Sequence, residues 1–119
     1  MASVLGMARR TMPKASTHPS IKDLHWAAGL LEGEGCFTAG TNGSERVHCE
    51  MADEAPIKKL QALFGGSVKA RKPKKENRKP TFAWWICGSR ARGVMMTLYI
   101  LLSPRRQQRI IEMLTHANT

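Results

Sequence analysis

Residues 20–33 show the hydrophobic spacing of a helix with two different sides. Ser20 and Asp23 have the Ser-x-x-Asp spacing of a capping box, which predicts a helix from about Ile21 to Glu32. Two apolar surfaces on one helix imply two neighbours. A glycine inside a helix costs about 1 kcal/mol relative to alanine, so Gly29 either marks the close approach of another helix or is simply tolerated. One stripe holds Ile21, Leu24, Ala28 and Leu31, and the second surface holds Ala27, Gly29, Leu30 and Gly33.

From Cys36 onward the pattern changes to alternating polar and apolar positions. Two such segments flank an Asn-Gly turn at residues 41–44, which is typical of a β-hairpin. Asp53 is placed to cap a second helix, and the Gly-Gly pair at residues 65–66 is expected to end it. The apolar face expected for this helix consists of Ile57, Leu60 and Phe64.

The second half of the chain repeats the order of hairpin and helix. Residues 67–72 and 81–87 predict a second hairpin around a charged turn. A third helix is expected from Ser89, and Pro104 occupies the first helical position of a fourth. The element order α, ββ, α, ββ, α, α predicts a single α+β domain over residues 20–119.

The first 19 residues differ from the rest of the chain. They hold three basic residues and no acid, and they show no apolar period. This composition predicts a flexible basic N-terminal arm. An organelle transit peptide is the alternative interpretation.

Composition limits the classes of function. A chain of 119 residues with 42% hydrophobic positions supports one core but not separate cofactor, substrate and lid domains. No apolar run approaches the roughly 20 residues that span a bilayer, so no membrane partner is expected. Three cysteines without CxxC spacing argue against a disulfide framework and a zinc knuckle. We expect a soluble, intracellular protein of the cytoplasm or nucleoid, or of an organelle matrix if the first residues are a transit peptide.

The net charge of +10 indicates a polyanionic partner, and much of it is concentrated in one hairpin. Residues 69–79 contain seven cationic side chains against one acid, Glu76. A basic β-ribbon suits contacts with nucleic-acid phosphates, although a solvated loop is the alternative. On the following strand, Phe82, Trp84 and Trp85 are aromatic, and at least two of them are expected to pack the sheet onto its helices. The cationic residues are Lys69, Arg71, Lys72, Lys74, Lys75, Arg78 and Lys79.

Two carboxylates, Glu32 and Glu34, fall at the C-terminal end of the first predicted helix. The helix dipole is negative there, so each acid is unfavourable by up to about 1 kcal/mol. A positive group is therefore expected beside them. Mg²⁺ is one candidate, because carboxylates and backbone carbonyls are the hard oxygen ligands it takes. An arginine or lysine in a structural ion pair is the other.

The stretch Trp26-Ala-Ala-Gly-Leu-Leu-Glu-Gly-Glu-Gly-Cys-Phe37 resembles the LAGLIDADG motif of homing endonucleases, matched by residues 27–35. Residues 51–66 and 101–108 also resemble the family, and the likeness covers roughly residues 20 to 116. It implies the αββαββαα fold, with a saddle-shaped antiparallel sheet and helices on one face. A single motif implies a homodimer whose motif helices pack across a two-fold axis. The expected interface residues are Ala27, Gly29, Leu30 and Gly33.

The resemblance also implies the roles of several residues. Glu34 matches the acid that binds metal at the scissile phosphate, joined by the carbonyl of Gly33, and a glutamate replaces the consensus aspartate. Two-fold symmetry would bring a second Glu34 alongside and complete a site for Mg²⁺ or Mn²⁺. Glu32 is expected to have a structural role, and Arg105 corresponds to a basic residue near the catalytic centre. The residues expected to contact DNA are Arg46, Lys69, Arg71, Lys72, Lys74, Lys75, Arg78, Lys79 and Arg106.

These features favour one function over two alternatives. The leading hypothesis is a Mg²⁺-dependent, homodimeric homing endonuclease that hydrolyses both strands of a specific double-stranded DNA site and serves intron or intein mobility. Its sheets would lie in the major groove, and its paired Glu34 residues would face the minor groove. The first alternative is a catalytically inactive module of the same fold, either a maturase that binds RNA or a DNA-binding regulator. The second is a general basic nucleic-acid chaperone or ribosome-associated protein.

Overall fold

A computed structural model describes residues 19–39, 44–73 and 76–117. The predicted order of elements is confirmed, but the arm up to residue 18 and the tip of the first hairpin lie outside the described residues. The elements are α2 (Ile21–Glu34), β1 (Gly35–Ala39), β2 (Glu45–Met51), α3 (Glu54–Phe64), β3 (Ser67–Arg71), β4 (Thr81–Cys87), α4 (Ser89–Leu98), the 3-10 helix η1 (Tyr99–Leu101) and α5 (Pro104–Ala117).

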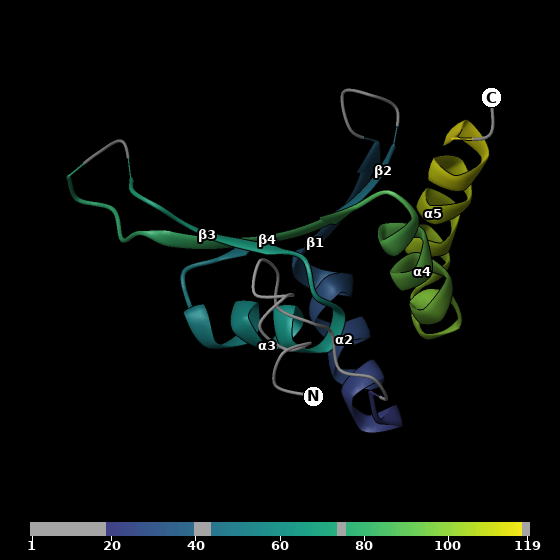
Figure 1. The fold of residues 1–119 in the computed structure, drawn as a ribbon, viewed down its shortest axis with the longest axis horizontal. Helices are drawn as coiled ribbons and strands as arrows, with labels where there is room; N and C mark the ends of the chain where they lie inside the picture. Colours follow the sequence, from purple (N-terminus) through teal and green to yellow (C-terminus); the bar gives the residue numbers. More distant parts are fainter. Residues whose placement is uncertain (1–18, 40–43, 74–75, 118–119) are drawn as a thin grey trace, which may run out of the picture.

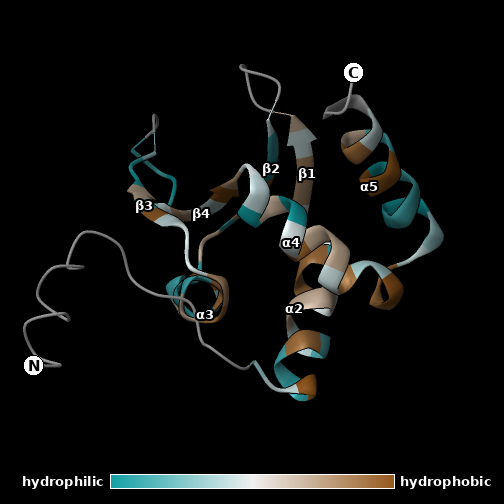
Figure 2. Ribbon diagram, turned by 45° about the vertical axis from the view of Figure 1, so that its right-hand side comes forward, coloured by the Kyte–Doolittle hydropathy of each residue, from teal (hydrophilic) through white to brown (hydrophobic). Residues whose placement is uncertain are grey.

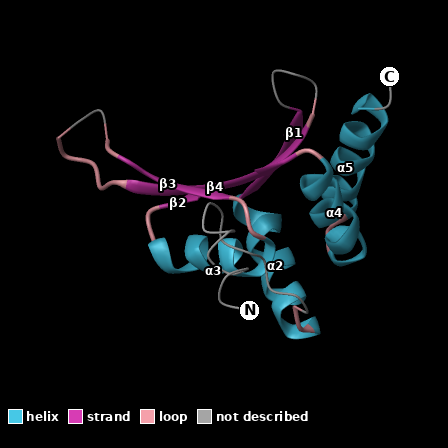
Figure 3. Cartoon of the chain, viewed as in Figure 1, coloured by secondary structure: helices cyan, strands magenta, loops and turns pink. Residues whose placement is uncertain are grey.

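The four strands form one antiparallel sheet in the order β1-β2-β4-β3. The sheet is curved, and α2 and α3 pack beneath its convex face while α4 and α5 lie at the end near β1 (Figures 1 and 3). No described helix covers the concave face. The α+β class and the placement of helices on one face of the sheet are therefore confirmed.

Helix α2 begins where the sequence predicts and ends two residues later. Ser20 Oγ accepts from the Asp23 backbone N–H, and the Asp23 carboxylate accepts from the Ser20 N–H, which forms the expected capping box. At the other end the backbone N–H of Gly35 donates to the carbonyl of Leu31. A Cβ at Gly35 would lie 2.8 Å from that same oxygen, so the chain passes from helix to strand at a position that only glycine fills without displacement.

The buried face of α2 differs from the predicted stripe. Ala27, Ala28 and Leu31 are buried, Leu24 is half-buried, and Ile21 is 72% exposed. The core stripe is thus the i, i+3, i+4, i+7 series that starts at Leu24. The sequence interpretation placed Ala27 on the second surface and Ile21 on the same stripe as Leu24, and both placements are corrected.

Helix α3 packs on the sheet around a buried tryptophan. Trp84 is fully buried, and its Nε1 donates to the carbonyl of Gly65 at 2.8 Å. Asp53 caps the helix as predicted, and Phe64 packs against the core with its ring 6.3 Å from that of Trp84. Leu63, which was not predicted, is also buried. Figure 2 shows α3 almost end-on, hydrophilic on one side and hydrophobic on the other. The contacts of Trp84 with the end of α3 therefore hold the sheet against this helix.

The aromatic residues of β4 divide between the two faces of the sheet. Phe82 and Trp84 belong to the core or pack against it, whereas Trp85 points to the opposite, helix-free face because strand residues alternate. The expectation that at least two of the three pack the sheet onto its helices is confirmed. Across residues 19–39, 44–73 and 76–117, no helix is long and apolar enough to cross a membrane.

Candidate active site and nucleic-acid interface

Glu32 is held by the start of α5. Its carboxylate accepts from the backbone N–H of Ser103 at 2.8 Å and from the Ser103 hydroxyl at 2.7 Å. These hydrogen bonds, with smaller contributions from nearby Arg106 and Arg105, lower the pKa of Glu32 below its ordinary value of 4.5. Both carboxylate oxygens of Glu32 accept hydrogen bonds from Ser103, which agrees with the structural role expected for Glu32.

The positive group expected at the end of α2 is also present. Arg106 Nε donates to the backbone carbonyl of Glu32 at 3.1 Å, and Arg105 Nη2 lies 3.9 Å from the Glu32 carboxylate. The guanidinium of Arg106 also lies 5.7 Å above the ring of Phe37. Arg106, which the sequence assigned to DNA contact, thus satisfies an end carbonyl of the helix.

Glu34 stands in contrast to Glu32. It is the last residue of α2 and is exposed, and within the described part of the chain no hydrogen bond or ion pair engages its carboxylate. Its charge reaches the neighbouring strand: burial raises the pKa of the Cys49 thiol to about 11, and the carboxylate of Glu34 adds to that rise. The carboxylate therefore lies beside the β1–β2 pair with its oxygens available.

The donors at this helix end fit a hard divalent cation only in part. The Glu34 carboxylate and the carbonyl of Gly33 are oxygen ligands of the kind Mg²⁺ takes, and the helix dipole favours a cation here. However, residues 19–39, 44–73 and 76–117 contain no group of three or more His, Cys, Asp or Glu side chains able to hold a metal. One chain supplies a single carboxylate, so a complete site requires further ligands.

The second surface of α2 is open. A Cβ built at Gly29 or at Gly33 meets no atom of this chain within 4 Å, and Leu30 between them is half-buried. Ala27 does not belong to this surface, because it is fully buried in the chain's own core. The expected interface is thereby reduced to Gly29, Leu30 and Gly33.

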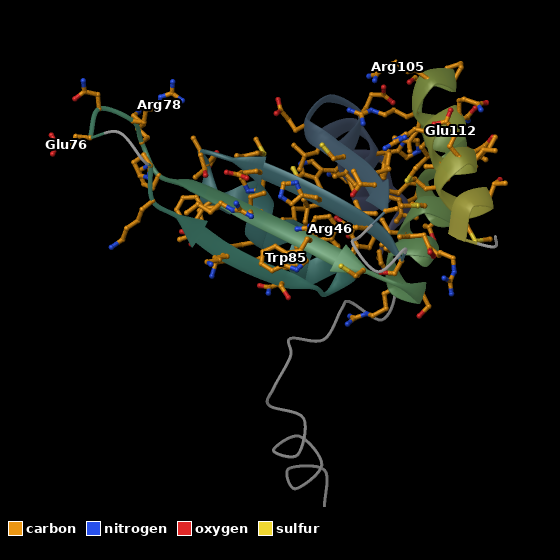
Figure 4. All side chains as sticks on the ribbon, turned by 90° about the horizontal axis from the view of Figure 1, so that it is seen from above. Arg46, Glu76, Arg78, Trp85, Arg105 and Glu112 are labelled. Carbon is orange, nitrogen blue, oxygen red and sulfur yellow. The ribbon has the colours of Figure 1, made fainter. Side chains whose placement is uncertain are left out.

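The helix-free face of the sheet carries polar and basic side chains from neighbouring strands. The Arg46 guanidinium lies 5.7 Å from the ring centroid of Trp85, and Arg46 Nε is buried without a hydrogen-bond partner in the described part of the chain (Figure 4). Glu50 accepts from the Thr81 hydroxyl at 2.6 Å and lies 3.7 Å from Arg71 Nε. Among its described residues, the face therefore holds one buried donor without a partner, Arg46 Nε, together with one engaged acid, Glu50.

The basic hairpin extends beyond the sheet. Lys69, Arg71 and Lys72 are exposed at the β3 side, and Arg78 and Lys79 are exposed just before β4. Lys74 and Lys75 lie outside the described residues. In Figure 4 the turn with Glu76 and Arg78 lies at the opposite end of the molecule from Arg105. The hairpin and the end of α2 are thus separate sites.

Sequence reasoning gave three residues no role at these surfaces, although Ser103 marks the start of the fourth predicted helix. Ser103 holds Glu32, Glu50 organises the sheet face, and Arg109 Nε donates to the carbonyl of Phe37 at 2.9 Å. The sequence did carry a signal for Ser103, since a serine before Pro104 marks a helix start, where backbone N–H groups and the serine hydroxyl are available to bind a carboxylate. Nothing local in the sequence indicated the partners of Glu50 and Arg109.

No family model matches the chain. A stretch of 54 residues, 44% of this chain, is 39% identical to 8% of the "intron-encoded RNA maturase bI4" of Saccharomyces cerevisiae. A stretch of 50 residues, 39% of this chain, is 42% identical to 7% of the "probable intron-encoded endonuclease aI2" of Debaryomyces hansenii. The chain therefore spans a small part of either relative. Part of it is similar to intron-encoded proteins, of which one is named a maturase and the other an endonuclease.

Proposed function

We propose that this chain is a single-motif protein of the LAGLIDADG type that acts as a Mg²⁺-dependent endonuclease on double-stranded DNA, working as a homodimer. The observation that carries the proposal is the contrast at the end of α2, where Glu32 is fully engaged by Ser103 and Glu34 is exposed and unengaged. A carboxylate left free at a helix C-terminus is locally unfavourable unless a cation joins it. A metal site gives Glu34 that cation.

A second copy supplies what one chain lacks. Two α2 helices packed through Gly29, Leu30 and Gly33 would bring two Glu34 carboxylates and two Gly33 carbonyls together. When bound there, Mg²⁺ supplies an activated water and stabilises the oxyanion that leaves. Isologous packing of the same surface on both chains is the commonest way to close a dimer. The open space beside both glycines supports this arrangement.

Arg105 is the candidate partner of the scissile phosphate. Its side chain is 74% exposed and lies 3.9 Å from Glu32, so it projects from the first turn of α5 beside the end of α2. An arginine stays protonated, and it therefore stabilises phosphate charge but does not serve as a general base. We assign it electrostatic stabilisation of the phosphate, with Glu34 as the metal ligand.

The helix-free face of the sheet is the proposed DNA surface. A curved antiparallel sheet presents alternate side chains to one side, and Arg46, Lys69 and Arg71 share that side by register. The basic hairpin would follow the phosphates beyond it. The sheets would enter the major groove, and the paired ends of α2 would face the minor groove.

A maturase is the second candidate, since one of the two similar proteins carries that name. In that case the same fold binds RNA, and Glu34 has no role in cleavage. The two candidates differ in what Glu34→Gln changes. The nuclease predicts that wild type with Mg²⁺ cuts members of a randomised duplex library, whereas Glu34→Gln binds the same duplexes without cutting. Wild type that binds duplexes but never nicks them overturns the nuclease and leaves the maturase.

A further inference from the structure

A groove runs between the edge strand β1 and helix α5. Its lining includes Cys36 of β1, which follows Glu34 by two residues in the sequence. Three arginines and one glutamate line it, so its charge is positive. Figure 4 shows Arg105 and Glu112, which mark its α5 side, at the end of the molecule away from the basic hairpin. The lining residues used below are Thr38, Arg105, Arg106, Gln108, Arg109 and Glu112.

Two of the arginines are anchored in the same way. Arg106 Nε donates to the carbonyl of Glu32 at 3.1 Å, and Arg109 Nε donates to the carbonyl of Phe37 at 2.9 Å. A guanidinium has five N–H donors in one plane, so a bond from Nε fixes the plane and leaves the Nη donors. Holding the side chain in advance removes part of the entropy cost that an arginine pays when it grips a ligand.

Opposing charge in the groove is weak. Glu112 lies 3.4 Å from Arg109 Nη1, but the two side chains are 51% and 45% exposed and sit three residues apart on one helix. Exposed pairs of this kind contribute little, so an incoming anion competes with Glu112 at small cost. Gln108 and Thr38 add uncharged hydrogen-bonding groups to the same groove.

We propose that the groove between β1 and α5 binds a backbone phosphate of duplex DNA, with the Nη donors of Arg106 and Arg109 forming the grip. The planar fork of an arginine matches two phosphate oxygens. This inference rests on the proposed function for its ligand class, and it adds a phosphate contact outside the sheet face and the hairpin. In this arrangement the groove holds the DNA strand whose backbone continues past the end of α2.

The test is a salt titration of binding to a mixed-sequence DNA duplex in EDTA, which separates binding from cleavage. Arg109→Gln is compared with Arg90→Gln, because Arg90 on α4 is also exposed and also donates to a backbone carbonyl, that of Phe64 at 3.5 Å. Both variants lose one charge. Each lost phosphate contact makes the negative slope of log K against log salt shallower by about 0.9. Arg109→Gln is expected to lose that much for each chain of the dimer, about 1.8 in all, and Arg90→Gln to lose none.

A second pair keeps the anchors intact. Gln108→Glu puts one negative charge into the groove and leaves Arg106 and Arg109 in place. Thr97→Glu puts one negative charge on the exposed side of α4. We expect Gln108→Glu to weaken duplex binding at least fivefold more than Thr97→Glu. Equal behaviour within both pairs overturns the groove proposal while wild-type binding and Mg²⁺-dependent cleavage stand. A wild type that fails to bind duplex DNA overturns both the groove and the proposed function.

Discussion

Ser103 donates two hydrogen bonds to the carboxylate of Glu32, one from its backbone N–H at 2.8 Å and one from its hydroxyl at 2.7 Å. The two residues are 71 positions apart in sequence. Their contact fastens the end of the motif helix to the start of α5, and it leaves Glu34, two residues on, as the free carboxylate. Glu32 is therefore bound within its own chain, whereas the Glu34 carboxylate is exposed.

Removal of the Ser103 hydroxyl is predicted to loosen that junction. Ser103→Ala should lower the free energy of unfolding by about 1–2 kcal/mol, because a hydrogen bond to a charged group is lost at a helix start. Ser89→Ala is the control, since Ser89 begins α4 and no side-chain cap bond forms there. Urea unfolding measures both. Equal losses in the two variants contradict the junction.

The pKa of Glu32 predicts a pH dependence. Because the folded protein lowers this pKa, the stabilisation is complete above the ordinary value of 4.5 and is lost as the pH falls through the lower folded value. The difference in unfolding free energy between wild type and Glu32→Gln should be constant above pH 4.5 and shrink below it. Glu54→Gln removes an exposed pair with Lys58 and an acid in the first turn of α3, and it should show a small difference throughout. A constant difference for Glu32→Gln down to pH 2 contradicts this account.

The fold was more predictable from the sequence than the site. Element order followed from local signals, such as the capping box at Ser20 and the proline that starts α5. The buried face of α2 was misassigned at Ala27 and Ile21, because more than one stripe suits this helix by period and only the packing against the sheet decides which is buried. The partners of Glu32 and Arg109 are contacts between distant segments, so no local pattern revealed them. Glu34 was identifiable through the motif alone.

Substitution of Gly29 is predicted to separate folding from assembly. A Cβ at this position meets nothing beyond its own helix turn within 4 Å, and leucine has a higher helix propensity than glycine, so the monomer should remain at least as stable. The surface against a second α2 would be blocked, and the mass by sedimentation should fall to that of a monomer. Gly93→Leu is the matched control, because Gly93 on α4 is also exposed with open space around it. A dimer that survives Gly29→Leu rejects this interface.

Trp84 is predicted to carry much of the packing between α3 and the sheet. Trp84→Phe leaves the buried carbonyl of Gly65 without its donor and opens a small cavity, so unfolding should become easier by about 2–3 kcal/mol. Trp85→Phe, on the opposite face, should cost less than about 1 kcal/mol. Chemical denaturation compares the two. Similar costs for both substitutions argue against the assigned orientation of β4.

Each chain is proposed to supply half of a catalytic site, and mixing of wild-type and variant subunits tests this proposal. Wild type and Glu34→Gln are mixed in equal amounts, allowed to exchange, and assayed with Mg²⁺ for total strand cuts, nicks and double-strand breaks together, in a duplex that wild type cuts. If both carboxylates are needed, cutting falls to roughly one quarter, because one dimer in four has two intact chains. A fall to one half means that each chain acts alone and contradicts the shared site.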